Sequence, residues 1–159
     1  MEYNSRLLLH APNIFKGDPR PLGDDIYAPC SSLPKKFLAS CYFAEPDWWA
    51  GVLHRDYKKI GDLCAAISDA EYKTQCFLGV GKGIVWFQPK LTDRAVRICD
   101  TMPKKEYSLL CRSQAAMVVH MRTGDESLAA KICEGLDAKD KSICLEMPGM
   151  SGMRTQPNN

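Results

Sequence analysis

The segment Cys99-Asp-Thr-Met-Pro-Lys-Lys-Glu-Tyr-Ser-Leu-Leu-Cys111 begins and ends with a cysteine, and such a pair recurs four times in the chain. The first cysteines of the pairs are 34, 35 and 34 residues apart: Cys30, Cys64, Cys99 and Cys133. The second cysteines are 35, 35 and 33 residues apart: Cys41, Cys76, Cys111 and Cys144. A fixed period of this length is typical of stacked helix hairpins. The sequence therefore predicts a four-copy repeat domain over residues 30–146.

Apolar residues flank the first cysteine of each pair at helical spacing. They occupy positions −4, −1, 0 and +3 relative to that cysteine, which lie on one face of an α-helix. In the second copy these residues are Ile60, Leu63, Cys64 and Ile67. We expect short helices over 56–67, 93–102 and 126–136, and helices carrying the second cysteine over 34–44, 69–88, 104–121 and 138–146. Pro46 should end or kink the first of these, with residues 47–54 continuing in another direction.

This pattern predicts an all-α fold, a short α-solenoid of four helix-hairpin repeats of 34–35 residues. Residues 1–29 lie outside the repeat and are rich in proline and glycine, so we expect an irregular N-terminal arm. The arm either caps the first repeat or links it to an upstream domain. Residues 147–159 contain glycine, proline, asparagine and methionine, which predicts a flexible tail.

Eight cysteines allow 105 disulfide pairings, and helix geometry reduces them. At 1.5 Å per residue, Cys64 and Cys76 lie about 4.5 and 10.5 Å from their shared turn. Cys76 and Cys99 lie about 18 and 9 Å from the other turn, so their heights differ by more than those of Cys64 and Cys76. We therefore predict one disulfide within each hairpin: Cys30–Cys41, Cys64–Cys76, Cys99–Cys111 and Cys133–Cys144. Buried free thiols are the alternative, but they would not require two cysteines at fixed positions in every copy.

Four disulfides predict an oxidising, extracytoplasmic location, either periplasmic or secreted. The apolar run Leu7–Leu9 is too short for the core of a signal peptide, so we expect a leader that has been removed. The longest aliphatic run, Ala115 to Val119, is far short of the ~20 residues of a membrane span. A formal net charge of +2 over 159 residues does not indicate nucleic-acid binding.

The mid-thirties period and the single cysteine pair per hairpin give residues 30–146 a resemblance to Sel1-like, cysteine-rich secreted repeats. These repeats are themselves relatives of tetratricopeptide arrays. The likeness is one of architecture, because the cysteines of that family lie closer together. It implies binding of a protein or peptide and no specific catalytic activity.

No pattern of catalytic residues stands out. His10, His54 and His120 have no ligand partner three or four residues away, and the cysteine spacing fits neither a zinc site nor a Cys-x-x-Cys redox site. We therefore expect a non-enzymatic binding, assembly or scaffold module without a cofactor. Its partner would be a protein or peptide, within a larger complex or alone, and the sequence leaves its oligomeric state open.

Two sets of residues are candidates for contact with a ligand. Trp48 and Trp49 are adjacent, so their side chains leave a helix about 100° apart, and we expect one of them, together with Tyr42, to anchor a partner. The second set consists of evenly spaced thioethers in the tail, at Met147, Met150 and Met153. Thioethers select Cu(I), so the alternative function is periplasmic copper handling.

Overall fold

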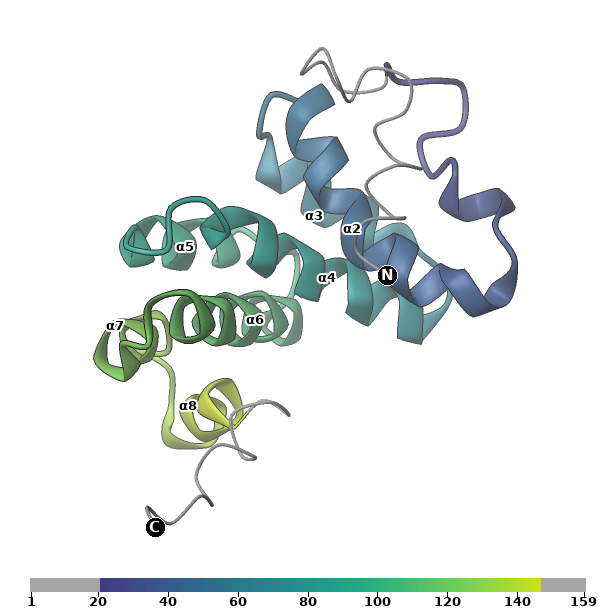
Figure 1. Cartoon of the computed structure of the whole chain (residues 1–159). Coiled ribbons are helices and arrows are strands. Elements are labelled where there is room, and N and C mark those ends of the chain that lie inside the picture. Colours follow the sequence, from purple (N-terminus) through teal and green to yellow (C-terminus); the bar gives the residue numbers. More distant parts are fainter. Residues whose placement is uncertain (1–20, 147–159) are drawn as a thin grey trace, which may run out of the picture. The chain divides into compact units, whose positions relative to one another are not determined.

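The computed structural model describes residues 21–146, and over this range the chain is α-helical with no β-strand (Figure 1). The elements are a 3-10 turn and seven α-helices: η2 (Cys30–Ser32), α2 (Lys35–Val52), α3 (Tyr57–Ala66), α4 (Ala70–Val85), α5 (Thr92–Cys99), α6 (Lys105–Thr123), α7 (Glu126–Ile132) and α8 (Ala138–Leu145). They belong to two compact units, Met1–Val80 and Gly81–Asn159. No helix in the described range is long and apolar enough to cross a membrane.

Four disulfides join consecutive elements into four helix hairpins. They are the predicted pairs, with Cα–Cα distances of 5.5 to 5.9 Å: Cys30–Cys41, Cys64–Cys76, Cys99–Cys111 and Cys133–Cys144. Each pair links a short element to the helix that follows it, and all eight cysteines are buried. The predicted all-α fold of repeated helix hairpins is confirmed.

The predicted apolar stripe forms the buried side of the short helices. The residues at position −4, Ile60, Ala95 and Ala129, are buried together with the cysteines that follow them. At position −1, Leu63 and Ile98 are half-buried, whereas Ile132 is fully buried. The stripe is therefore centred on the cysteine, because the disulfide holds this side of the short helix against the helix that follows it.

In the first unit, α2 continues through Pro46, so of the two expected outcomes, an end or a kink of the helix, the end is excluded. Proline removes one backbone hydrogen bond from a helix interior. Here the proline is buried and packs near Gly79 of α4, where an added Cβ would lie 3.2 Å from Pro46 Cγ and 2.2 Å from the Phe43 carbonyl oxygen. Glycine at this position lets the backbones of α2 and α4 approach closely, and this packing keeps the proline inside the helix.

In the second unit, α6 packs against α5, α7 and α8. Its interior face consists of fully buried small and branched residues: Ala115, Ala116, Val118 and Val119. Gly81 in α4 also lies against α6, since a Cβ there would lie 2.1 Å from the Cys111 carbonyl oxygen. The side chains of Asp125 and Asp137 begin α7 and α8 by accepting hydrogen bonds from the Leu128 and Asp140 amides, both at 2.9 Å.

Candidate functional site

Both candidate tryptophans are buried. Trp48 and Trp49 have relative exposures of 0%, so the prediction that one of them projects toward a partner is wrong. Adjacent side chains leave a helix about 100° apart, yet both indoles are covered here. The irregular segment that precedes the first hairpin was not considered in the prediction.

That segment covers Trp49. The indole Nε1 donates a hydrogen bond to the Ile26 carbonyl at 3.0 Å, and the Tyr27 ring meets the indole edge-on with centroids 5.7 Å apart. The Tyr27 hydroxyl in turn donates to the Leu63 carbonyl at 3.1 Å, and burial raises the pKa of this phenol, with Asp25 adding to the effect. Residues 26–27 therefore tie the arm to α2 and to the end of α3. This contact favours the cap interpretation for the described part of the arm.

Tyr42 also has a packing role. Its ring stacks on that of Tyr72 with centroids 5.5 Å apart and planes 15° apart, which joins α2 to α4 within the first unit. Burial raises the pKa of the Tyr42 phenol, and the neighbouring carboxylate of Glu45 raises it further. Tyr42 therefore joins the first hairpin to the second, whereas Trp49 joins the arm to α2.

The structure does not test the copper hypothesis, because Met147, Met150 and Met153 lie outside the described residues. Within that range, one group of side chains has three metal-ligating atoms within 4.8 Å of one another: Cys30, Cys41 and Glu45. Both sulfur atoms are in a disulfide and offer no thiolate. Glu45 is fully buried, with Oε2 2.9 Å from the Cys30 sulfur. In this oxidised state the group is not a metal site.

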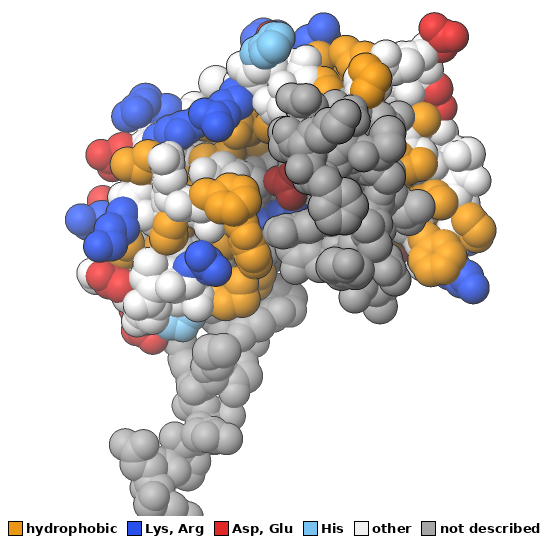
Figure 2. Space-filling view, turned by 45° about the horizontal axis from the view of Figure 1, so that its top comes forward, with side chains coloured by type: hydrophobic (Ala, Val, Ile, Leu, Met, Phe, Trp, Pro, Cys, Tyr) orange, Lys and Arg blue, Asp and Glu red, His pale blue; other side chains and the backbone are white. Residues whose placement is uncertain are grey.

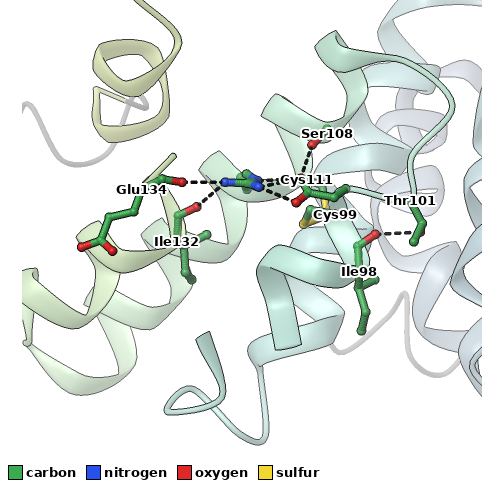
Figure 3. A network of polar contacts seen from close by, with 9 residues as sticks. Ile98, Cys99, Thr101, Ser108, Cys111, Ile132 and Glu134 are labelled. Carbon is green, nitrogen blue, oxygen red and sulfur yellow. Dashed lines mark hydrogen bonds and ion pairs between the residues drawn. A yellow bond between two sulfur atoms is a disulfide. The ribbon is translucent and has the colours of Figure 1, made fainter. Parts of the chain in front are cut away.

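A polar network around the buried Arg112 lies between the third and fourth hairpins, and Figure 3 shows it from close by. The Arg112 guanidinium forms a bidentate ion pair with Asp100, in which Nη2 donates to Oδ2 at 2.6 Å and Nε donates to Oδ1 at 3.0 Å. Its Nη1 donates to the carbonyls of Ile132 and Glu134 at 3.2 and 3.0 Å, at the C-terminal end of α7. Carbonyls at the end of a helix have no amide partner within the helix, so the Arg112 guanidinium supplies the hydrogen bonds that they accept. We interpret the network as a structural tie, since its donors are all engaged within the protein.

The exposed apolar side chains of the second unit include three near the ends of α4 and α6. Phe87 follows α4 and is 83% exposed, Met121 in α6 is 57% exposed, and Leu91, just before α5, is 45% exposed. Half-buried Trp86 lies under the Arg122 guanidinium, which is 5.2 Å from the ring centroid. We call these five residues the Phe87 surface. On the face of the molecule drawn in Figure 2, exposed hydrophobic side chains lie beside lysine and arginine side chains.

Sequence reasoning missed this surface because it extended the helix to residue 88, whereas α4 ends at Val85 and Phe87 lies beyond it. The available signal was the string Trp86-Phe87-Gln-Pro89, in which two large aromatic residues fall just before a helix breaker. Aromatic residues in a turn cannot follow a buried helical stripe, so one of them should be exposed. The cation–π contact between Trp86 and Arg122 does not follow from the repeat pattern, so the repeat could not predict it.

Comparison with known proteins gives no relative from which a function could be transferred. No family model, no curated protein and no solved structure matches the chain. What is established is therefore the architecture, an all-α chain in which four helix pairs are each joined by a disulfide.

Proposed function

We propose that the protein is a non-enzymatic binding or assembly module that recognises another protein or a peptide, as its resemblance to Sel1-like and tetratricopeptide arrays implies. The observation that supports this proposal is the Phe87 surface, because Phe87 is 83% exposed and Met121 and Leu91 are also exposed. Exposed apolar residues that form a contiguous patch mark sites of interaction.

The disulfides support a binding role on energetic grounds. Each closes a short loop, with cysteines 11 or 12 residues apart, and fixes one hairpin. A surface held rigid before binding loses less conformational entropy when a partner docks. The disulfides also indicate an oxidising, extracytoplasmic environment. We propose the bacterial periplasm or the secreted fraction as the compartment.

A reconstitution experiment tests the proposed function. The oxidised full-length protein is used to capture partners from the extracytoplasmic fraction, and each candidate is then purified and titrated by calorimetry. We expect at least one candidate to bind directly, and we expect binding to be lost after reduction and alkylation of the disulfides. Failure of every purified candidate to bind would contradict the proposal, and so would turnover of a small-molecule substrate by the protein alone.

A further inference from the structure

We propose that the Cys30–Cys41 disulfide is a site of thiol–disulfide exchange, which a dithiol reduces ahead of the other three disulfides. The buried carboxyl group of Glu45 supplies the proton for this step. The inference goes beyond the binding role proposed above and does not depend on it, because it assigns a chemical reaction to one of the four disulfides.

A carboxyl group lies against one sulfur atom of this disulfide. Glu45 Oε2 is 2.9 Å from Cys30 Sγ, and Glu45 is fully buried in α2, one helical turn after Cys41. A disulfide sulfur has lone pairs but no hydrogen, so a hydrogen bond over this distance requires a proton on the carboxyl group, whose O–H then donates to the sulfur. The neutral carboxyl is also the form that burial favours. A proton is therefore held beside the Cys30 sulfur in the oxidised protein.

This arrangement distinguishes the first disulfide from the other three. Within residues 21–146, Cys30, Cys41 and Glu45 are the only three His, Cys, Asp or Glu side chains whose ligand atoms all lie within 4.8 Å of one another. The same test would detect a carboxylate at any other disulfide of this range. Proton transfer from a side chain to a leaving sulfur is therefore available at one disulfide.

The first disulfide is also the one with residual exposure. Cys41 is 4% exposed, whereas the other seven cysteines are 0% exposed. Cys30 belongs to η2, a 3-10 turn of three residues whose other two members, Ser31 and Ser32, are exposed. Exposed backbone with few buried contacts opens locally at low cost. A reagent therefore attacks the Cys41 sulfur, and the Cys30 sulfur beside Glu45 is the leaving group.

The reaction is a balanced two-electron exchange. One thiol of the reagent loses its proton to solvent and attacks Cys41 Sγ, which breaks the bond to Cys30 and forms a mixed disulfide on Cys41. The electron pair of the broken bond stays on Cys30 Sγ, which takes the proton from Glu45 and becomes a thiol. The second thiol of the reagent also loses its proton to solvent and displaces Cys41. Solvent then protonates Cys41 and restores the proton on Glu45.

The protein therefore gains two electrons and two protons, and the dithiol leaves as a disulfide. One dithiol is consumed per chain, so the exchange is stoichiometric. General acids of this kind accelerate a reaction by about 10²–10⁴-fold. An acid beside one sulfur atom thus gives one disulfide a large kinetic advantage over three that lack it.

The test follows each disulfide separately in the oxidised full-length protein. Dithiothreitol is added in excess under native conditions, timed samples are quenched with acid, and the free thiols are alkylated and mapped by mass spectrometry. We expect Cys30–Cys41 to be reduced at least tenfold faster than each other pair. Cys133–Cys144 is the internal control. In both hairpins the residue three positions after the first cysteine, Leu33 or Leu136, is half-buried, but only the first has the carboxyl group.

Matched variants test the proton donor. Glu45→Gln keeps the size of the side chain and removes the acid, so reduction of Cys30–Cys41 should slow at least tenfold while the other three rates stay within twofold. The control is Glu71→Gln, which changes an exposed glutamate of α4 and should leave all four rates within twofold. The direction separates chemistry from structure, because a variant that only loosens the packing exposes the disulfide and accelerates its reduction. Circular dichroism should show unchanged helix content in both variants.

Three results would overturn the inference. They are reduction of another pair before Cys30–Cys41 or together with it, reduction of Glu45→Gln as fast as the unmodified protein or faster, and equal slowing by Glu71→Gln. The first is measured on the unmodified protein, so it decides the matter even where Glu45→Gln does not fold.

A second arm identifies the source of the dithiol, with a reduced Cys-x-x-Cys protein in place of dithiothreitol. Faster reduction than by dithiothreitol at equal concentration assigns a protein dithiol, and slower reduction assigns a small one. Cys30–Cys41 must be the first pair reduced in both arms, and any other order contradicts the site.

Discussion

Replacing Gly81 with alanine tests the packing of α4 on α6. In the structure, an added Cβ would lie 2.1 Å from the Cys111 carbonyl oxygen, 3.0 Å from its carbonyl carbon and 3.1 Å from the Ala115 amide nitrogen. All three atoms belong to the backbone, so no side chain can rotate away. Cys111 is also held by its disulfide to Cys99, which restrains the carbonyl that would have to move.

The magnitude follows from two opposing effects. An ordinary contact between carbon and a carbonyl oxygen is about 3.3–3.6 Å, so α4 would have to move away from α6 by roughly 1.2 Å or more. Overpacking of this kind costs about 1–3 kcal/mol, and more where the neighbours are rigid. Alanine would recover about 1 kcal/mol of helix propensity within α4. Because the clash is severe and involves only backbone atoms, we expect a net loss of about 2 kcal/mol in the free energy of unfolding.

The assay is urea unfolding followed by circular dichroism, with the disulfides intact. In a chain of this size, a loss of about 2 kcal/mol corresponds to a fall of roughly 4–8 °C in the melting temperature. Gly23→Ala is the control, because a Cβ at that position meets nothing within 4 Å, and its effect should stay within about 0.5 kcal/mol. A Gly81→Ala protein as stable as the unmodified one would refute the close approach of the two helices.

Four further results are expected. Non-reducing peptide mapping should find only disulfides within hairpins, and removing one by a double Cys→Ser change should cost about 3 kcal/mol for a loop of this length; a link between hairpins would contradict the fold. Arg112→Met should lower the free energy of unfolding by about 2–3 kcal/mol, and Arg112→Lys should recover only part of it, because lysine lacks the bidentate fork; full recovery would refute the role assigned to the fork. The Asp140 amide, and then Lys105, lower the pKa of Asp137 below its ordinary value of 3.8, so the stability that this carboxylate contributes is present above that value and is lost as the pH falls below it. The stability difference between the unmodified protein and Asp137→Ala, measured by urea unfolding, should therefore shrink from pH 6 to pH 2, and a constant difference would contradict this. Copper handling by the tail methionines predicts that the full chain binds Cu(I) more tightly than a chain ending at Glu146, and equal affinities in a competition titration would end that hypothesis.

The repeat and its disulfides could be predicted because they depend on local spacing. Helical rise alone decides whether Cys64 can reach Cys76, and no distant residue changes that distance. For the same reason the expected helix over 104–121 is close to the observed α6, Lys105–Thr123. Features governed by one helix and its immediate turn are readable from the sequence.

The interaction candidates could not be predicted in the same way, because burial depends on what arrives from elsewhere in the chain. Trp49 is covered by Ile26 and Tyr27, which precede the first hairpin and carry no periodic pattern. Pro46 stays inside α2 because Gly79, more than thirty residues away in the sequence, allows a close contact. Phe87 is exposed because it lies in a turn, where no period assigns a face. In each case tertiary packing overrides the local rule.

The order of the cysteine pairs has a consequence for how the chain is made. The first cysteine of each pair is bonded to the next cysteine along the sequence, 11 or 12 residues later, and no disulfide encloses another. A chain that crosses into an oxidising compartment from its N-terminus therefore exposes each pair completely before the next pair emerges. Oxidation during translocation then meets one possible pairing at a time, whereas a fully reduced chain released all at once must choose among 105. This topology allows native bonds to form in sequence order without a disulfide isomerase.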